Sequence, residues 1–157
     1  TLRASLSGTP QRYQFDSHPF NIPGTVKGRL VGGNLALLAH LCGTKSFPST
    51  KNAILFLEDV GEYTYNVDRM LYQLKRSGAF KKVAGVIIGG FTDSKDTDRP
   101  FGKTMDEIIN EVISDMGVPV CFNFPVSHGL ENVALKIGAN YKLTISGQHS
   151  ILKELQP

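Results

Sequence analysis

The chain has 157 residues, of which 41% are apolar and 20% charged, and its 17 basic and 14 acidic side chains leave a net charge of +3. This composition excludes disorder, and a chain of this length can bury the core of one domain without disulfides or metals. The basic residues are dispersed in short pairs, which excludes the clustered stripe of a nucleic-acid-binding protein. Every apolar run falls short of the roughly 18 residues of a membrane span.

The two cysteines, Cys42 and Cys121, form neither a CxxC pair nor a zinc-binding pattern. Both lie beside apolar residues, so we interpret them as small buried side chains in a reduced, cytosolic protein, with one disulfide between them as the alternative. No signal peptide opens the chain, but Thr1 is not a natural start, and we therefore expect a fragment or an engineered piece.

The first 24 residues are polar and interrupted by prolines, with little apolar pattern beyond Tyr13 and Phe15. We predict an extended arm or interdomain linker over residues 1–24 and a single domain over residues 25–157.

Strands and helices alternate from residue 26 onward. Asn34 is expected to cap a short helix, the apolar spacing over 67–74 predicts a second helix, and Thr104 with Glu107 forms a capping box for a third. Apolar runs predict strands at 26–31, 53–57, 83–88, 118–122, 134–137, 141–145 and 151–155. The order predicts a mixed, mostly parallel α/β sheet flanked by helices, with antiparallel hairpins at the end.

Two ionisable side chains follow predicted strands at the edge where open α/β sheets bind their ligands. Glu58 comes directly after 53–57, and His128 follows the strand at 118–122 by a short turn. They could form the orienter and base of a nucleophilic site, whereas spacing alone favours a helix-capping Glu and a solvated His.

A nucleophile is missing from this pattern. The chain has no GxSxG elbow, and Ser127 is adjacent to His128, which is usually the wrong geometry for a hydrogen bond between them. An elbow and an evident oxyanion nest are also missing around the other loop and helix serines, Ser46, Ser49, Ser94, Ser114 and Ser146.

The other motifs are weak. Gly28, Gly32 and Gly33 match neither a dinucleotide loop nor a Walker loop, so we predict a tight turn with close packing there. The histidines His18, His40 and His149 are isolated, and we predict no metal and no cofactor.

Five segments together carry a family resemblance. They are Gly32-Gly33-Asn34-Leu35 with Gly43-Thr44, then Ile54-Leu55-Phe56-Leu57-Glu58-Asp59 with Glu62 and Tyr65, then Asp68-Arg69-Met70-Leu71 with Gln73-Leu74, then Gly85 to Phe91, and finally Phe124-Pro125-Val126-Ser127-His128-Gly129. In this order and spacing the chain resembles the LD-carboxypeptidase family of serine peptidases (muramoyltetrapeptide carboxypeptidases) over about residues 24–145.

The resemblance implies a fold of the swivelling β/β/α type and a Ser-Glu-His triad shared between two domains. It assigns Glu58 and His128 to the triad, with Glu62 as the competing glutamate. The serine would lie on an N-terminal domain absent from this chain, which makes the chain inactive by itself. The implied substrate is the murein tetrapeptide, cleaved in the cytoplasm at its L,D bond with release of D-alanine during peptidoglycan recycling.

Two other functions remain open. One is a microcin-C immunity-type peptidase, which would share Glu58 and His128. Such a peptidase would need aromatic residues to stack a nucleobase, and the loop 44–52 contains only Phe47. The other is a noncatalytic binding domain, in which Glu58 and His128 would lie apart. We also expect an exposed apolar patch near the arm and His128, and a homodimer.

Overall fold

The strands form one curved sheet with most helices on one face. The structure is a computed structural model and describes residues 1–129 and 132–156. The helices are α1 (Leu2–Leu6), α2 (Leu35–Leu41), α3 (Thr64–Ser77) and α4 (Met105–Ile113), with a 3₁₀ turn η1 (Ser114–Met116). The strands are β1 (Arg12–Asp16), β2 (Gly24–Asn34), β3 (Ala53–Val60), β4 (Gly85–Thr92), β5 (Val120–Cys121), β6 (Asn140–Ile145) and β7 (His149–Glu154).

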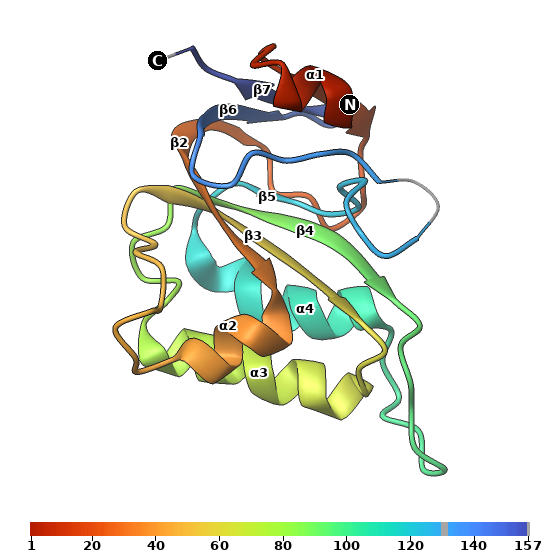
Figure 1. Ribbon diagram of the computed structural model, residues 1–157. Helices are drawn as coiled ribbons and strands as arrows, with labels where there is room; N and C mark the ends of the chain where they lie inside the picture. The colour runs from red at the N-terminus through yellow and green to blue at the C-terminus, as the bar shows by residue number, and fades with distance from the viewer. Residues whose placement is uncertain (130–131, 157) are drawn as a thin grey trace.

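The sheet combines a parallel half with an antiparallel half. Its seven strands lie in the order β1-β7-β6-β2-β3-β4-β5. Strands β2, β3, β4 and β5 are parallel to one another, whereas the pairs β1–β7, β7–β6 and β6–β2 are antiparallel. The predicted mixed α/β sheet flanked by helices is therefore confirmed. Helices α2, α3 and α4 lie on one side of β3 and β4, whereas α1, β6 and β7 lie on the other (Figure 1).

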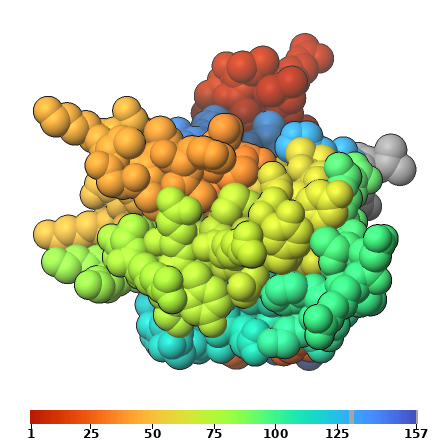
Figure 2. Space-filling view, turned by 90° about the horizontal axis from the view of Figure 1, so that it is seen from below, coloured from red at the N-terminus to blue at the C-terminus, as the bar shows by residue number. Residues whose placement is uncertain are grey.

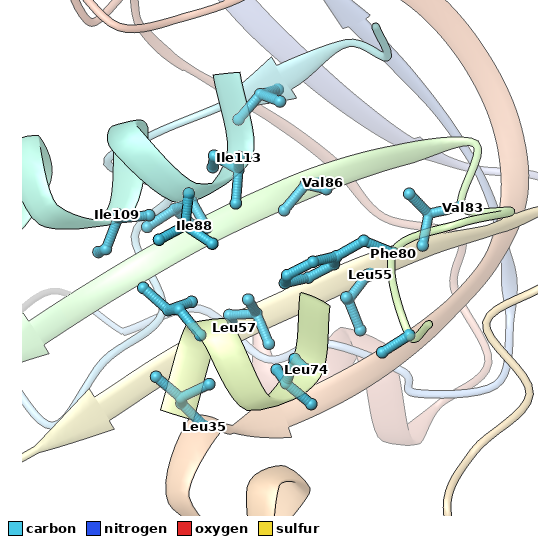
Figure 3. Packing of buried hydrophobic residues seen from close by; sticks show 14 of the residues in the cluster. Leu35, Leu55, Leu57, Leu74, Phe80, Val83, Val86, Ile88, Ile109 and Ile113 are labelled. Atoms are coloured by element: carbon cyan, nitrogen blue, oxygen red, sulfur yellow. The ribbon is translucent and has the colours of Figure 1, made fainter. Parts of the chain in front are cut away.

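Two apolar clusters stabilise this arrangement. One fills the space between the parallel strands and the three helices, where Leu57 and Ile88 face Leu74 and Ile109 (Figure 3). The other fills the inside of the curved sheet, where Phe124 packs edge-on against Tyr13 at 5.9 Å and Phe56 at 6.5 Å between ring centres. Strand β3 is buried from Ala53 to Asp59 because both of its faces are covered, as its continuous apolar run predicts.

The predicted helix caps are confirmed. The side chain of Asn34 accepts a hydrogen bond from the backbone N–H of Leu37, 3.1 Å away, at the start of α2. Thr104 and Glu107 form both bonds of the capping box at the start of α4. These caps were predictable because each involves residues within one helical turn.

The segment 1–24, predicted as an extended arm, is folded onto the domain. It contains α1 and the edge strand β1, which pairs with β7, and the backbone of Ile22 bonds to Val120 in both directions at 2.9 and 3.1 Å. The segment thus spans from one edge strand of the sheet to the other. That it connects this domain to another stays a prediction.

Two strand predictions need correction. Residues 134–137 form no strand, because their backbone groups bond to side chains: the Tyr13 hydroxyl donates to Ala134 O, and the Lys136 N–H donates to the Tyr141 hydroxyl. Strand β3 does not end before Glu58 but continues to Val60. Within the described residues, the helices are too short or too polar to cross a membrane.

Candidate active site

An irregularity between β3 and β4 marks the carboxyl edge of the parallel strands. Leu57 pairs with Ile88, but Asp59 pairs with Phe91, so one residue of β3, Glu58, lies opposite two residues of β4. Such a bulge bends the strand and redirects the side chains beside it. On its other side, β3 stays in register with β2, and Glu58 is the partner of Asn34.

The two β4 residues of the bulge are Gly89 and Gly90, and both lack room for a side chain. A Cβ atom on Gly89 would lie 2.5 Å from the carbonyl oxygen of Val126, and one on Gly90 would lie 2.4 Å from Cβ of Ser127. The backbone N–H of Gly90 also donates to the carbonyl of Val126 at 3.0 Å. The loop before His128 therefore lies directly on the bulge, which holds His128 beside Glu58.

Glu58 and His128 are in contact. Nδ1 of His128 lies 3.2 Å from Oε2 of Glu58, and the side chain of Glu58 is 10% exposed while that of His128 is 55% exposed. Oε2 is buried and makes no well-aligned hydrogen bond within the described part of the chain, so the 3.2 Å approach of Nδ1 is a close contact short of full hydrogen-bond alignment. With Nδ1 turned to the carboxylate, Nε2 is left available for another group.

The surroundings of Glu58 favour its neutral form. Burial raises the pKa of the Glu58 carboxyl above its ordinary value, and the neighbouring charge of Asp59 raises it further. The charge of His128 and the polar groups of His128 and Asn34 beside the carboxyl act in the opposite direction and lower this pKa. A desolvated carboxylate that depends on one imidazole for its stabilisation is suited to orient that imidazole and to stabilise its cation.

Asp59 supports the site from the helix side of the sheet, a role that the sequence analysis missed. Its carboxylate accepts hydrogen bonds from the Asn34 amide at 2.8 Å, the Ala36 N–H at 3.0 Å and the Val60 N–H at 2.8 Å. Asp59 thereby fixes the start of α2 and the strand end beside Glu58. The alternation of side chains along a strand could have revealed it, because adjacent residues of β3 point to opposite faces.

Glu62, the competing glutamate, has a different partner. It lies beyond β3, half-buried, and its Oε2 accepts a hydrogen bond from the side-chain amide of Asn66 at 3.1 Å. The contact with His128 comes from Glu58 instead. The geometry therefore favours Glu58 over Glu62 as the partner of the histidine.

The described residues add no bonded serine and no cluster of metal ligands to the pair. Among the described serines none bonds to His128, and the hydroxyl of Ser127 accepts a hydrogen bond from the Gly129 N–H at 2.9 Å. Over 1–129 and 132–156, His, Cys, Asp and Glu form no group of three that could hold a metal ion. Gly32 serves close packing, since a Cβ there would lie 2.0 Å from the carbonyl oxygen of Phe56.

A mixed α/β domain with a buried carboxylate against a half-exposed imidazole is an arrangement typical of hydrolases that use an activated nucleophile. The chain belongs to the LD-carboxypeptidase family, because residues 27–143 match the model of the LD-carboxypeptidase C-terminal domain.

Similar proteins agree with this assignment. The murein tetrapeptide carboxypeptidase of Pseudomonas aeruginosa is 34% identical over 114 residues, which are 72% of this chain and 36% of that protein. The crystal structure of muramoyltetrapeptide carboxypeptidase from Oxalobacter formigenes superposes with a TM-score of 0.89 at 30% identity, over 99% of this chain and 53% of that one. The microcin C7 self-immunity protein MccF of Escherichia coli is 28% identical over 149 residues, which are 92% of this chain and 42% of that protein. The chain thus spans about half or less of these relatives.

Proposed function

We propose that this chain supplies Glu58 and His128 to the active site of a serine-type LD-carboxypeptidase that releases D-alanine from the murein tetrapeptide. The observation that carries the proposal is the 3.2 Å contact between buried Glu58 and half-exposed His128 at the carboxyl edge of the parallel strands. The similarity to muramoyltetrapeptide carboxypeptidase supports the choice of substrate.

Each residue has a distinct role in this proposal. His128 takes the proton of the attacking serine through Nε2 and returns it to the leaving amine. Glu58 faces Nδ1, which fixes the tautomer and stabilises the imidazolium that forms during the reaction. Glu58 is suited to this role because burial leaves its carboxylate with little solvation of its own.

The serine comes from a separate N-terminal domain in this proposal. The chain spans 36% of the Pseudomonas protein and 53% of the Oxalobacter protein, which leaves room for such a domain. We therefore expect the 157-residue chain alone to release no D-alanine. Removal of a triad serine alone costs about 10⁶ in kcat in a well-studied triad enzyme.

We also place the enzyme in the cytoplasm and expect a homodimer. The cysteines Cys42 and Cys121 are both free thiols, which is consistent with a reducing compartment.

The decisive variant is His128→Ala in the full-length protein. Because it removes the general base, kcat for D-alanine release from UDP-MurNAc-tetrapeptide should fall by about 10⁶. His149→Ala, which changes a histidine of β7, serves as the matched control and should keep normal turnover. Turnover by His128→Ala close to that of the unchanged protein would refute the proposal.

The similarity to MccF supports a second candidate, cleavage of an aminoacyl or peptidyl nucleotide by the same pair. A nucleobase is commonly held by stacking on aromatic side chains, and this chain has no Trp and only Phe47 in the loop 44–52. An aminoacyl-nucleotide analogue offered in parallel with the murein peptide separates the two, since the preferred substrate should show the higher kcat/KM.

A further inference from the structure

The loop that carries His128 is held by few bonds once it leaves the sheet. Its last bond to β4 joins the carbonyl of Val126 to the N–H of Gly90 at 3.0 Å. For residues 127–129, a single further hydrogen bond is found within the described part of the chain. The N–H of Gly129 donates to the hydroxyl of Ser127 at 2.9 Å, and this bond spans His128.

The ring of His128 depends on this backbone for its direction. Figure 2 looks onto α2 (orange) and α3 (yellow-green), and from this side the segment after β5 (light blue) emerges at the edge of the molecule beside the end of β3 (yellow). The side chain of His128 is 55% exposed, and its ring approaches Glu58 without full hydrogen-bond alignment. Because the rotamers open to a side chain follow from its backbone angles, the position of Nε2 depends on how firmly residues 127–129 are held.

Ser127 is anchored to β4 by its own side chain. It is half-buried, and a Cβ atom added to Gly90 would lie 2.4 Å from Cβ of Ser127 and 3.1 Å from its Oγ. A Cβ atom added to Gly129 would lie 3.1 Å from the same Oγ. The hydroxyl oxygen thus lies between a glycine of β4 and the glycine that follows His128, and it connects the two.

The bond closes a compact turn around the histidine. A serine oxygen that accepts from the N–H two residues later restricts the backbone of the residue between them, which here is His128. Without this bond, the dihedral angles beside the ring would be free to vary. A displacement of about 1 Å in a catalytic group is enough to slow a reaction strongly.

We propose that Ser127 is a positioning residue for His128: its hydroxyl oxygen, anchored on Gly90, accepts the Gly129 N–H and holds the imidazole in the direction that the reaction needs. In this role Ser127 neither attacks the substrate nor exchanges a proton with it. The proposal rests on the peptidase function proposed above and adds to it a serine outside the triad.

The test is Ser127→Ala in the full-length protein. Alanine keeps the Cβ atom that packs against Gly90 and removes the acceptor of the Gly129 N–H. The kcat for D-alanine release should fall by about tenfold, as expected for one lost hydrogen bond, whereas KM should change by less than about twofold because Ser127 acts through His128. An unchanged kcat, or a loss that appears in KM alone, would overturn the proposal.

Conservative variants restore the acceptor. Ser127→Thr keeps a hydroxyl, and Ser127→Asn supplies a side-chain oxygen that forms the same kind of turn. At least one of the two should return kcat to within about threefold of the unchanged protein. If both are as slow as Ser127→Ala, the hydroxyl bond is not what positions the imidazole.

Ser146→Ala is the matched control. The hydroxyl of Ser146 also accepts from the N–H two residues later, that of Gln148, at 3.3 Å, but it lies in the turn between β6 and β7. This variant should keep its kcat even where its stability falls. An equal loss of kcat in Ser146→Ala and Ser127→Ala would show a general loss of stability and would overturn the positioning role.

Hydrogen exchange separates this proposal from the proposed reaction. The amide of Gly129 should exchange about tenfold faster in Ser127→Ala than in the unchanged protein, while that of Gly90, which bonds to Val126, should keep its rate. Equal exchange of Gly129 in both proteins would contradict the proposal. Should the full-length protein release no D-alanine, the peptidase function fails, and the exchange rate still decides whether Ser127 holds the backbone beside His128.

Discussion

At the scale of single residues, the central feature is a glutamate that stays within a buried strand. Glu58 is enclosed by β2 and β4, and its carboxyl contacts the ring of His128. Burial of a carboxyl without full hydrogen bonding destabilises its charged form, so the fold is less stable with Glu58 ionised than with it neutral. The buried position of Glu58 therefore lowers the stability of the fold, but it holds the carboxylate beside the imidazole of His128.

The stability of the chain should therefore depend on pH through Glu58. Because the folded-state pKa is raised above 4.5, the unfolded chain loses this proton first as the pH rises. The contribution of Glu58 to stability is complete below pH 4.5 and is lost as the pH rises through the raised folded-state pKa. Glu58→Gln stays neutral, so its free energy of unfolding relative to the unchanged chain should increase between pH 4 and pH 7.

Urea unfolding at the two pH values measures this difference. The exposed Glu111, changed to Gln, provides the control and should show a smaller change with pH. A Glu58→Gln variant that loses stability relative to the unchanged chain as the pH rises would contradict the assigned effect of burial.

The glycines of the bulge determine where His128 lies. In Gly90→Ala the new Cβ would be 2.4 Å from Cβ of Ser127, so the loop before His128 must move. We expect a loss of about 1–3 kcal/mol in the free energy of unfolding from overpacking. Turnover in the full-length protein should fall by about 10², as is typical of a catalytic group displaced by about 1 Å.

Gly147→Ala is a fair control for this change, since no atom lies within 4 Å of its Cβ position and its φ is not positive. It should keep both stability and turnover. Equal effects of the two changes would show that Gly90 acts through backbone flexibility and not through contact with Ser127.

At the scale of elements, α2 and the edge of the sheet are held together by one carboxylate. Asp59→Ala would leave the N–H groups of Ala36 and Val60 and the amide of Asn34 without their acceptor. A typical hydrogen bond contributes about 0.5–1.5 kcal/mol, and these three bonds are part-buried, so we expect a total loss of about 2–4 kcal/mol in the free energy of unfolding, measured by urea unfolding. Hydrogen exchange at the first turn of α2 should accelerate more than exchange in α4.

The comparison for this variant is Asp96→Ala. Asp96 also accepts from two backbone N–H groups and one side chain, at Thr97, Phe101 and Thr64, but it is exposed. Water can replace its bonds, so the loss should be smaller. A larger loss in Asp96→Ala than in Asp59→Ala would contradict the role given to Asp59.

An element was predictable from the sequence where the residues that stabilise it lie close together in the chain. The caps at Asn34 and Thr104 were predictable from neighbouring residues. Tyr13 and Phe15 were not assigned to a strand, because β1 pairs with β7 more than 130 residues later. The strand predicted at 134–137 was wrong for the same reason, since its backbone bonds to the side chains of the distant Tyr13 and of Tyr141 and not to another strand.

The candidate site was predictable only in part. The sequence placed Glu58 and His128 directly after two predicted buried strands. The family resemblance then assigned the triad glutamate to Glu58 in preference to Glu62. The bulge at Gly89 and Gly90 could not be predicted, because register is a property of two strands together. Asp59 was missed because its function depends on α2, whose position relative to β3 is set by packing.

At the scale of the whole molecule, the chain exposes several large apolar side chains. Leu2 and Leu6 on α1 are 63% and 79% exposed, Ile137 is 54% exposed, and Leu37 at the start of α2 is 66% exposed. The backbone N–H of Ala134 donates to the hydroxyl of Thr1, which connects α1 to the segment that contains Ile137. These residues could meet another domain or another copy of the chain.

We therefore expect the isolated chain to self-associate. Light scattering should show an apparent mass that increases with protein concentration, and Leu2→Ser combined with Leu6→Ser should reduce this increase. Leu152→Ser, which changes a fully buried residue of β7, is unsuitable as a control because it would disrupt the core. Tyr72→Ser on α3, 38% exposed, is the better comparison. A monomeric mass at all concentrations would count against the expectation.

The bulge glycines also affect how variation in this protein should be interpreted. Gly89 and Gly90 carry no functional group, yet almost any substitution at either position would push aside the loop that carries His128. In a mutational scan scored by growth or activity, both positions would therefore rank with Glu58 and His128, although neither takes part in a chemical step. The pattern of tolerated substitutions would then reveal the residues that position the imidazole as well as the reactive ones. A search for reactive side chains alone would overlook Gly89 and Gly90.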